Sequence, residues 1–173
     1  FLLTLFISTS TIPQTTPLIS NNEINWCDNS GLTWNDFLGK KEPYSHYSAI
    51  STTYLKIEYG CEHGRFNYSV KAMFVKDQSW SVNKHSHNLL EHEQLHFDIA
   101  ELYARKIRKF FDELESPCYI AKENIEQVVD ELYTDFEVAQ DLYDDETKHG
   151  LHEAKQASWN QAVYKVMHSL NVH

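Results

Sequence analysis

Apolar residues recur along this chain with two different periods, and the change between them predicts where strands give way to helices. Between residues 47 and 80, apolar and polar positions alternate in two segments rich in β-branched and aromatic residues. Residues 61–64, Cys-Glu-His-Gly, separate the two segments and are typical of a hairpin turn. We therefore expect two antiparallel strands. One face of the second would carry Phe66, Tyr68, Val70, Ala72 and Phe74.

Beyond residue 88 the apolar period changes to about 3.6, the repeat of an α-helix. Three helices are expected: one from about Leu89 to just before Pro117, one over about 122–143, and one over about 151–170. Ser86 or Asn88 is the expected N-cap of the first helix. The apolar stripe of the second would be Ile125, Val128, Val129, Leu132, Phe136 and Leu142. The chain is thus predicted to be an α+β protein with a small antiparallel sheet followed by three helices.

Length and composition narrow the class of protein further. The 173 residues suit one domain, and 42% apolar with 23% charged residues is close to the average for a soluble protein. The net charge of −10 argues against nucleic acid as a partner, because phosphate binding needs clustered lysine and arginine. No apolar run reaches the ~18 residues of a transmembrane segment, so the mature chain is expected to have none.

The chain begins with FLLTLFISTSTIPQTTP, a short apolar run followed by small hydroxyl residues. This composition is typical of a secretory signal peptide. We assign residues 1–21 to a signal-peptide remnant and flexible N-terminus, and residues 22–173 to the single domain. An N-terminal strand of the folded domain is the alternative interpretation of the first residues.

Three cysteines, none in a CxxC pair, argue against a thiolate zinc site or a dithiol redox motif. Outside the cytosol two of them could form a disulfide. The pair we expect is Cys27 with Cys61.

The strongest chemical signal is the segment LLEHEQLHFD, residues 89–98, which contains the pattern His-Glu-x-x-His. On a helix, His92 and His96 project from the same face one turn apart, so both imidazoles can bind one zinc ion at about 2.0–2.1 Å. Glu93 lies about 100° around the helix from His92. It is therefore placed to act as the general base for water that attacks a carbonyl. The alternative is that two unrelated histidines fall four residues apart by chance.

A catalytic zinc site needs a third protein ligand, and the spacing leaves several possibilities open. The motif does not continue to HExxHxxGxxH, because Ile99 and Leu102 occupy the glycine and third histidine positions. A glutamate of the second helix is one possibility, with candidates Glu126, Glu131 and Glu137. The other is the segment YDDETKHG, residues 143–150, with candidates Asp144, Asp145, Glu146 and His149.

Three segments together resemble a known family. These are LTWNDFLG (32–39), LLEHEQLHFDIAELYARKIR (89–108) and YDDETKHG (143–150) followed by Gln156 and Trp159. They are similar to the bacterial family catalogued as domain of unknown function 922, over about residues 24–159. Its members are inferred to be secreted zinc-dependent proteases. The resemblance implies a zincin-like fold, one zinc ion, a peptide or protein substrate, and a secreted or periplasmic location.

The resemblance also implies roles for individual residues. His92 and His96 would be ligands and Glu93 the catalytic base, while His149 would be the third ligand, with Asp144 and Glu146 as alternatives. Tyr143 would stabilise the oxyanion through its hydroxyl, or else be a packed aromatic. Asp98 would orient a ligand imidazole, or else be a surface acid.

By analogy with zincin-like folds, residues 71–80 would form a sheet edge beside the cleft, where an extended peptide pairs by β-augmentation. The competing interpretation of the whole chain is a non-catalytic zinc-binding envelope or interaction protein. An open coordination position favours the enzyme, and four protein ligands favour the structural role.

Overall fold

The computed structural model describes residues 22–27 and 31–170, and the predicted signal-peptide remnant lies outside them. The α+β class is confirmed: small antiparallel sheets precede three long helices. In chain order the elements are β1 (Glu23–Asn25), the 3₁₀ helix η1 (Trp34–Asp36), β2 (Ala49–Ile50), β3 (Thr53–Glu62), β4 (Arg65–Val75), β5 (Trp80–Ser81), α1 (His87–Asp112), the 3₁₀ helix η2 (Pro117–Tyr119), α2 (Lys122–Thr147) and α3 (Glu153–Ser169).

The predicted hairpin is confirmed and forms the long axis of the sheet. Strands β3 and β4 pair antiparallel from Thr53 opposite Phe74 to Glu62 opposite Arg65. The turn is His63–Gly64, and both residues have positive φ, which is the backbone of a two-residue turn that matches strand twist. The three-stranded order is β1-β4-β3, so β4 pairs on both sides. The expectation that residues 71–80 form a free sheet edge is therefore wrong for β4.

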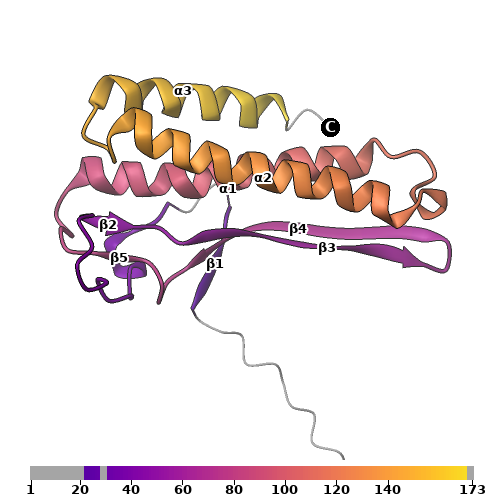
Figure 1. Ribbon diagram of the computed structural model, residues 1–173, viewed down its shortest axis with the longest axis horizontal. Coiled ribbons are helices and arrows are strands. Elements are labelled where there is room, and N and C mark those ends of the chain that lie inside the picture. The colour runs from indigo at the N-terminus through magenta and orange to yellow at the C-terminus, as the bar shows by residue number, and fades with distance from the viewer. Residues whose placement is uncertain (1–21, 28–30, 171–173) are drawn as a thin grey trace, which may run out of the picture.

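The three helices lie on the same side of the sheet, and α1 lies between the sheet and the other two (Figure 1). The predicted apolar face of β4 packs against this layer: Val70, Ala72 and Phe74 are buried, and Phe66 and Tyr68 pack against the same core. Because α1 is covered from two directions, its buried residues surround most of the helix. Polar side chains on α1 are consequently forced into the interior unless a cleft opens beside them.

The helix boundaries agree with the predictions to about two residues except at two ends: α1 ends at Asp112, about a turn short of Pro117, and α2 ends later than predicted. Ser86 is the N-cap of α1, and its hydroxyl accepts a hydrogen bond from the backbone N–H of Leu89 at 3.1 Å. Helix α2 continues through Thr147, a turn beyond the predicted end. Leu142 is half exposed, whereas Tyr143 is fully buried, so the apolar stripe follows Tyr143 and not Leu142. This extension places Asp144 on a helix instead of in a loop.

None of the helices within the described residues combines the length and apolar character needed to cross a membrane.

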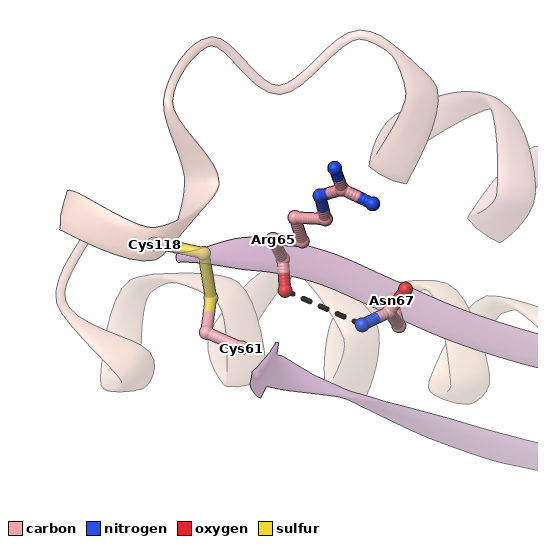
Figure 2. The surroundings of a disulfide bond; sticks show 4 residues. All are labelled: Cys61, Arg65, Asn67 and Cys118. Carbon is pink, nitrogen blue, oxygen red and sulfur yellow. Dashed lines mark hydrogen bonds between the residues drawn. A yellow bond between two sulfur atoms is a disulfide. The ribbon is translucent and has the colours of Figure 1, made fainter. Parts of the chain in front are cut away.

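A disulfide joins the tip of the β3–β4 hairpin to η2, the short helix after α1 (Figure 2). The bridge is Cys61–Cys118, with a Cα–Cα distance of 5.7 Å that is ordinary for disulfides. The expected pairing of Cys27 with Cys61 is wrong. Cys27 follows Trp26, whose backbone N–H donates to the carbonyl of Ala72 on β4. Cys61 instead lies opposite Phe66 on the same strand. At ~3.3 Å per residue those positions on β4 are about 20 Å apart.

Candidate metal centre

His92 and His96 lie in the N-terminal half of α1 and project from one face of it, as their spacing predicts. Both residues are buried, and their Nε2 atoms lie 3.3 Å apart. Two nitrogens bound to one tetrahedral zinc ion at 2.0–2.1 Å would be separated by about 3.3–3.4 Å. The pair is thus spaced as two ligands of one ion would be.

Asp144, from the last turns of α2, brings a carboxylate oxygen to the same point. Its Oδ1 lies 3.0 Å from His92 Nε2, 3.1 Å from His96 Nε2 and 3.2 Å from His149 Nδ1. The donor atoms of His92, Asp144 and His149 all lie within 4.8 Å of one another, a grouping that could hold a metal ion. The structure thus brings the predicted ligand His149 and its alternative Asp144 to one site.

The other carboxylates considered from the sequence point elsewhere. Glu146 accepts a hydrogen bond from the indole of Trp159 and pairs with Lys155 on α3. The remaining candidates lie along the outer faces of α2: Glu126 pairs with Lys122, Glu131 with Gln127, Asp145 with Lys148, and Glu137 is exposed. Of the acids proposed as third ligand, Asp144 alone reaches the histidines among the described residues.

Two glutamines fix the orientation of the imidazoles. Gln156 on α3 donates from its Nε2 to Asn160, so its Oε1 faces His92 Nδ1 at 3.1 Å. Gln140 on α2 donates to the carbonyl of His96 at 2.9 Å, so its Oε1 faces His96 Nδ1 at 2.6 Å. Each amide oxygen requires an N–H at Nδ1, which leaves Nε2 as the acceptor in the neutral imidazole.

This arrangement directs acceptor atoms toward one another. In the neutral tautomers, two Nε2 lone pairs and the Asp144 carboxylate meet without a donor between them, so a proton or a metal cation must lie there. The electrostatics agree. Burial raises the pKa of the Asp144 carboxyl, but the contacts with His92 and His96, where a proton must be shared when no metal is bound, outweigh burial and hold that pKa well below its usual range. Burial lowers the pKa of His96, but Asp144 reverses this and raises it.

Replacing Gln140 with leucine is expected to weaken zinc binding by about 10–100-fold, because the His96 imidazole loses the acceptor that fixes its tautomer. Competition with a fluorescent zinc chelator would measure the change. Gln127→Leu, on the exposed face of the same helix, is the matched control and should bind zinc as the wild type does. Equal affinity in Gln140→Leu would show that Gln140 only packs against the site.

Glu93 lies beside the two histidines with one carboxylate oxygen unpaired. The residue is 2% exposed, and its Oε2 has no hydrogen-bond partner among the described residues. Burial raises the pKa of the Glu93 carboxyl, and the neighbouring His96, Ser51 and His92 only partly offset this. A buried carboxylate oxygen without a partner costs stability, so its retention calls for a functional reason.

The histidines and Glu93 line a cleft of about 560 Å³. One wall is the start of α1, the second is the segment 46–51 that contains β2, and the third is the junction of α2 and α3. Strand β2 pairs with β5, through Ala49 opposite Ser81 and Ile50 opposite Trp80. The strand beside the cleft is therefore β2, not the predicted residues 71–80.

A family model described as "Bacterial protein of unknown function (DUF922)" matches residues 30–150. The match covers more than half of the chain and includes the four residues whose side chains converge at the candidate metal site, His92, His96, Asp144 and His149. The chain belongs to this family. No curated protein and no solved structure matches the chain significantly. The expected membership in DUF922 is thus confirmed, and the family itself has no established function.

In this DUF922 chain, Tyr143 lies beside the two histidines of the candidate metal site. Its ring stacks on His92 at 4.7 Å between centroids, and it is fully buried. Its hydroxyl donates to Gln156 Oε1 at 2.7 Å and lies 3.2 Å from the His92 carbonyl. These contacts suit a residue that positions His92. The assignment of Tyr143 to the oxyanion stays a prediction.

Asp98 lies on another side of α1 from the histidine pair. It accepts hydrogen bonds from the indole of Trp26 and the amide of Gln94, both at 2.8 Å. It therefore anchors β1 to α1, and the expectation that it orients a ligand imidazole is wrong.

The junction between α2 and α3 has an unusual backbone. Lys148, His149 and Gly150 follow one another with φ of 52°, 53° and 80°. Gly150 packs on His92: a Cβ at Gly150 would lie 3.0 Å from His92 Cβ. A side chain there would crowd His92 and strain the backbone, so glycine favours this close approach to His92.

The two orienting glutamines are not among the site residues predicted from the sequence: Gln140 is absent from that prediction, and Gln156 enters it only through the resemblance to the family. A signal was present on α2, where Gln140 and Asp144 interrupt the buried stripe that continues from Phe136 to Tyr143 and Thr147. Polar residues in a buried stripe indicate partners inside the protein.

Proposed function

We propose that this protein is a zinc-dependent peptidase of zincin type that hydrolyses peptide bonds with Glu93 as general base. The observation that carries the proposal is the Glu93 Oε2 atom. This buried oxygen has no hydrogen-bond partner in the described part of the chain, and Glu93 lines the same cleft as the converging donors of His92, His96 and Asp144. A site built only to hold a metal would have no need of this oxygen.

The donor set suits zinc, because imidazoles combined with a carboxylate are typical of its protein sites. When bound there, zinc would supply Lewis acidity, which polarises a carbonyl and makes water nucleophilic near neutral pH. His92, His96 and Asp144 would hold the ion, together with His149. Gln140 and Gln156 keep the two α1 imidazoles in the tautomer with Nε2 available.

The chain's own residues account for the proton transfers. Oε2 of Glu93 accepts the proton of the attacking water and then returns it to the nitrogen of the leaving amine, since one buried carboxylate can serve both steps. Burial raises the pKa of this carboxyl, which makes Oε2 a stronger proton acceptor in the first transfer. Tyr143 supports these steps by holding His92 in place through its stacked ring.

Strand β2 supports a peptide as the substrate. The Ser48 carbonyl accepts from the Val82 N–H at 2.9 Å, so Ser48 faces β5, and in an antiparallel pair the next residue, Ala49, turns its backbone groups the other way. An extended peptide in the cleft could therefore pair with β2 at Ala49. The disulfide Cys61–Cys118 further supports a secreted or periplasmic location, because such bonds persist in oxidising compartments.

A second function is favoured by the number of donors. His92, His96, Asp144 and His149 together make four, and four protein ligands are typical of a structural zinc site. The alternative is therefore a non-catalytic zinc-binding protein of the envelope.

The test combines metal analysis with hydrolysis. We expect one zinc ion per chain by elemental mass spectrometry, and cleavage of a mixed peptide library followed by mass spectrometry. Removing the ion with 1,10-phenanthroline should abolish cleavage, and added zinc should restore it. Stoichiometric zinc without cleavage would favour the non-catalytic alternative. A protein that purifies without zinc and does not take it up would contradict both.

A further inference from the structure

Asp144 Oδ1 and the three imidazoles around it, those of His92, His96 and His149, make four donors, which is one more than a peptidase needs. A catalytic zinc ion keeps one position for water or substrate, and three protein ligands hold it. If the proposed function is correct, one of the four donors must leave during turnover. The structure distinguishes the four by how firmly each is held.

Three donors are held by long helices and by neighbours. His92 and His96 are buried on α1, and each has its Nδ1 bonded to a glutamine. Asp144 lies within α2, one turn before its end, and its Oδ1 contacts both of these histidines. Removing any of these donors from the site would require breaking the contacts between helices.

His149 is held far more loosely. It lies outside both helices, and its side chain is 48% exposed. Its imidazole contacts Asp144 Oδ1 through Nδ1 and meets the edge of the Tyr47 ring at 4.7 Å between centroids. Its backbone N–H is bonded to the Asp144 carbonyl at 3.0 Å, so the main chain is fixed while the side chain can turn. Exposed side chains change rotamer within picoseconds to nanoseconds.

We propose that His149 is an exchangeable ligand, which completes the coordination of the metal at rest and turns out of the site when substrate enters, while Asp144 remains as the third permanent ligand. This inference rests on the proposed function. It reverses the order expected from the sequence, in which His149 was the third ligand and Asp144 the alternative.

Tyr47 is the residue that holds the His149 imidazole from the opposite wall of the cleft. It lies on the cleft wall just before β2 and is half exposed. Its contact with His149 links the two walls of the cleft, so a substrate that lies along β2 must displace this contact. Losing the Tyr47 ring should therefore favour the state in which His149 has left.

The experiment uses the zinc-loaded full chain and compares wild type with His149→Ala and Asp144→Ala. X-ray absorption at the zinc edge should count three imidazoles in the wild type and two in His149→Ala, which keeps one zinc ion per chain. Asp144→Ala should lose zinc on gel filtration. His46→Ala is the matched control, because it removes another exposed imidazole from the same cleft and should leave three bound.

Binding of acetohydroxamate, a small zinc-chelating probe, gives an independent readout by calorimetry. Its affinity should rise by at least about tenfold in His149→Ala and to a lesser extent in Tyr47→Ala, because the ligand no longer has to displace the imidazole. Three results would overturn the inference: loss of zinc from His149→Ala, two bound imidazoles in the wild type, or equal affinity of acetohydroxamate for the wild type and His149→Ala. Absence of zinc from the wild type would overturn the proposed function as well, whereas these three results would leave it standing.

Discussion

Glu93→Gln is expected to hydrolyse peptides about 10²–10⁴-fold more slowly than wild type while keeping its zinc ion, because the amide cannot accept the proton of the attacking water. The side chain keeps its size, so the buried position next to His92 stays filled. Initial rates on a single peptide found in the library would measure the loss, and elemental analysis would verify the metal. Circular dichroism would show that the variant is folded.

The matched control is Glu91→Gln, which changes an exposed glutamate on the same helix, paired with His87. Its rate should equal that of wild type. Two results would contradict the assigned role of Glu93. Wild-type activity in Glu93→Gln would place the base elsewhere, and loss of zinc from it would make Glu93 part of the metal site.

Removing the Cys61–Cys118 disulfide is expected to lower the free energy of unfolding by roughly 4 kcal/mol, the loop-closure value for a separation of 57 residues. The bridge connects the hairpin tip to η2, so without it the unfolded chain regains the freedom of the whole intervening segment. Both cysteines should be replaced together, as Cys61→Ser with Cys118→Ser, since a single replacement would leave an additional thiol that can form disulfides between chains. Urea unfolding followed by fluorescence would give the difference.

The control for this measurement is a reducing agent. It should destabilise wild type by a similar amount and have no effect on the double variant. Equal midpoints for oxidised wild type and the double variant would mean that the bridge contributes little. A reductant effect on the double variant would mean that it acts elsewhere on the chain.

The sequence by itself determined the order of the strands and helices and the placing of His92 and His96 on one face of α1. Alternation from Phe66 to Phe74 and the helical period after residue 88 are local consequences of which face of each element is buried, so they were correctly predicted. The closeness of His92 and His96 is equally local, because four residues on one helix fix their relation. The HExxH spacing therefore needed no tertiary information.

Only the tertiary structure decided which residues of α2, α3 and their junction complete that site. Helix α2 ends one turn later than its apolar pattern predicts, because Tyr143 and Thr147 are buried in the packing between the helices. This additional turn brings Asp144 to the histidines. Gln140 and Gln156 reach the imidazoles because α2 and α3 pack beside α1. The disulfide was likewise misassigned, because the pairing depends on where the hairpin tip lies relative to η2. Contacts within one helix follow from its period, whereas contacts between helices depend on how they pack, and a single sequence carries no direct signal of that packing.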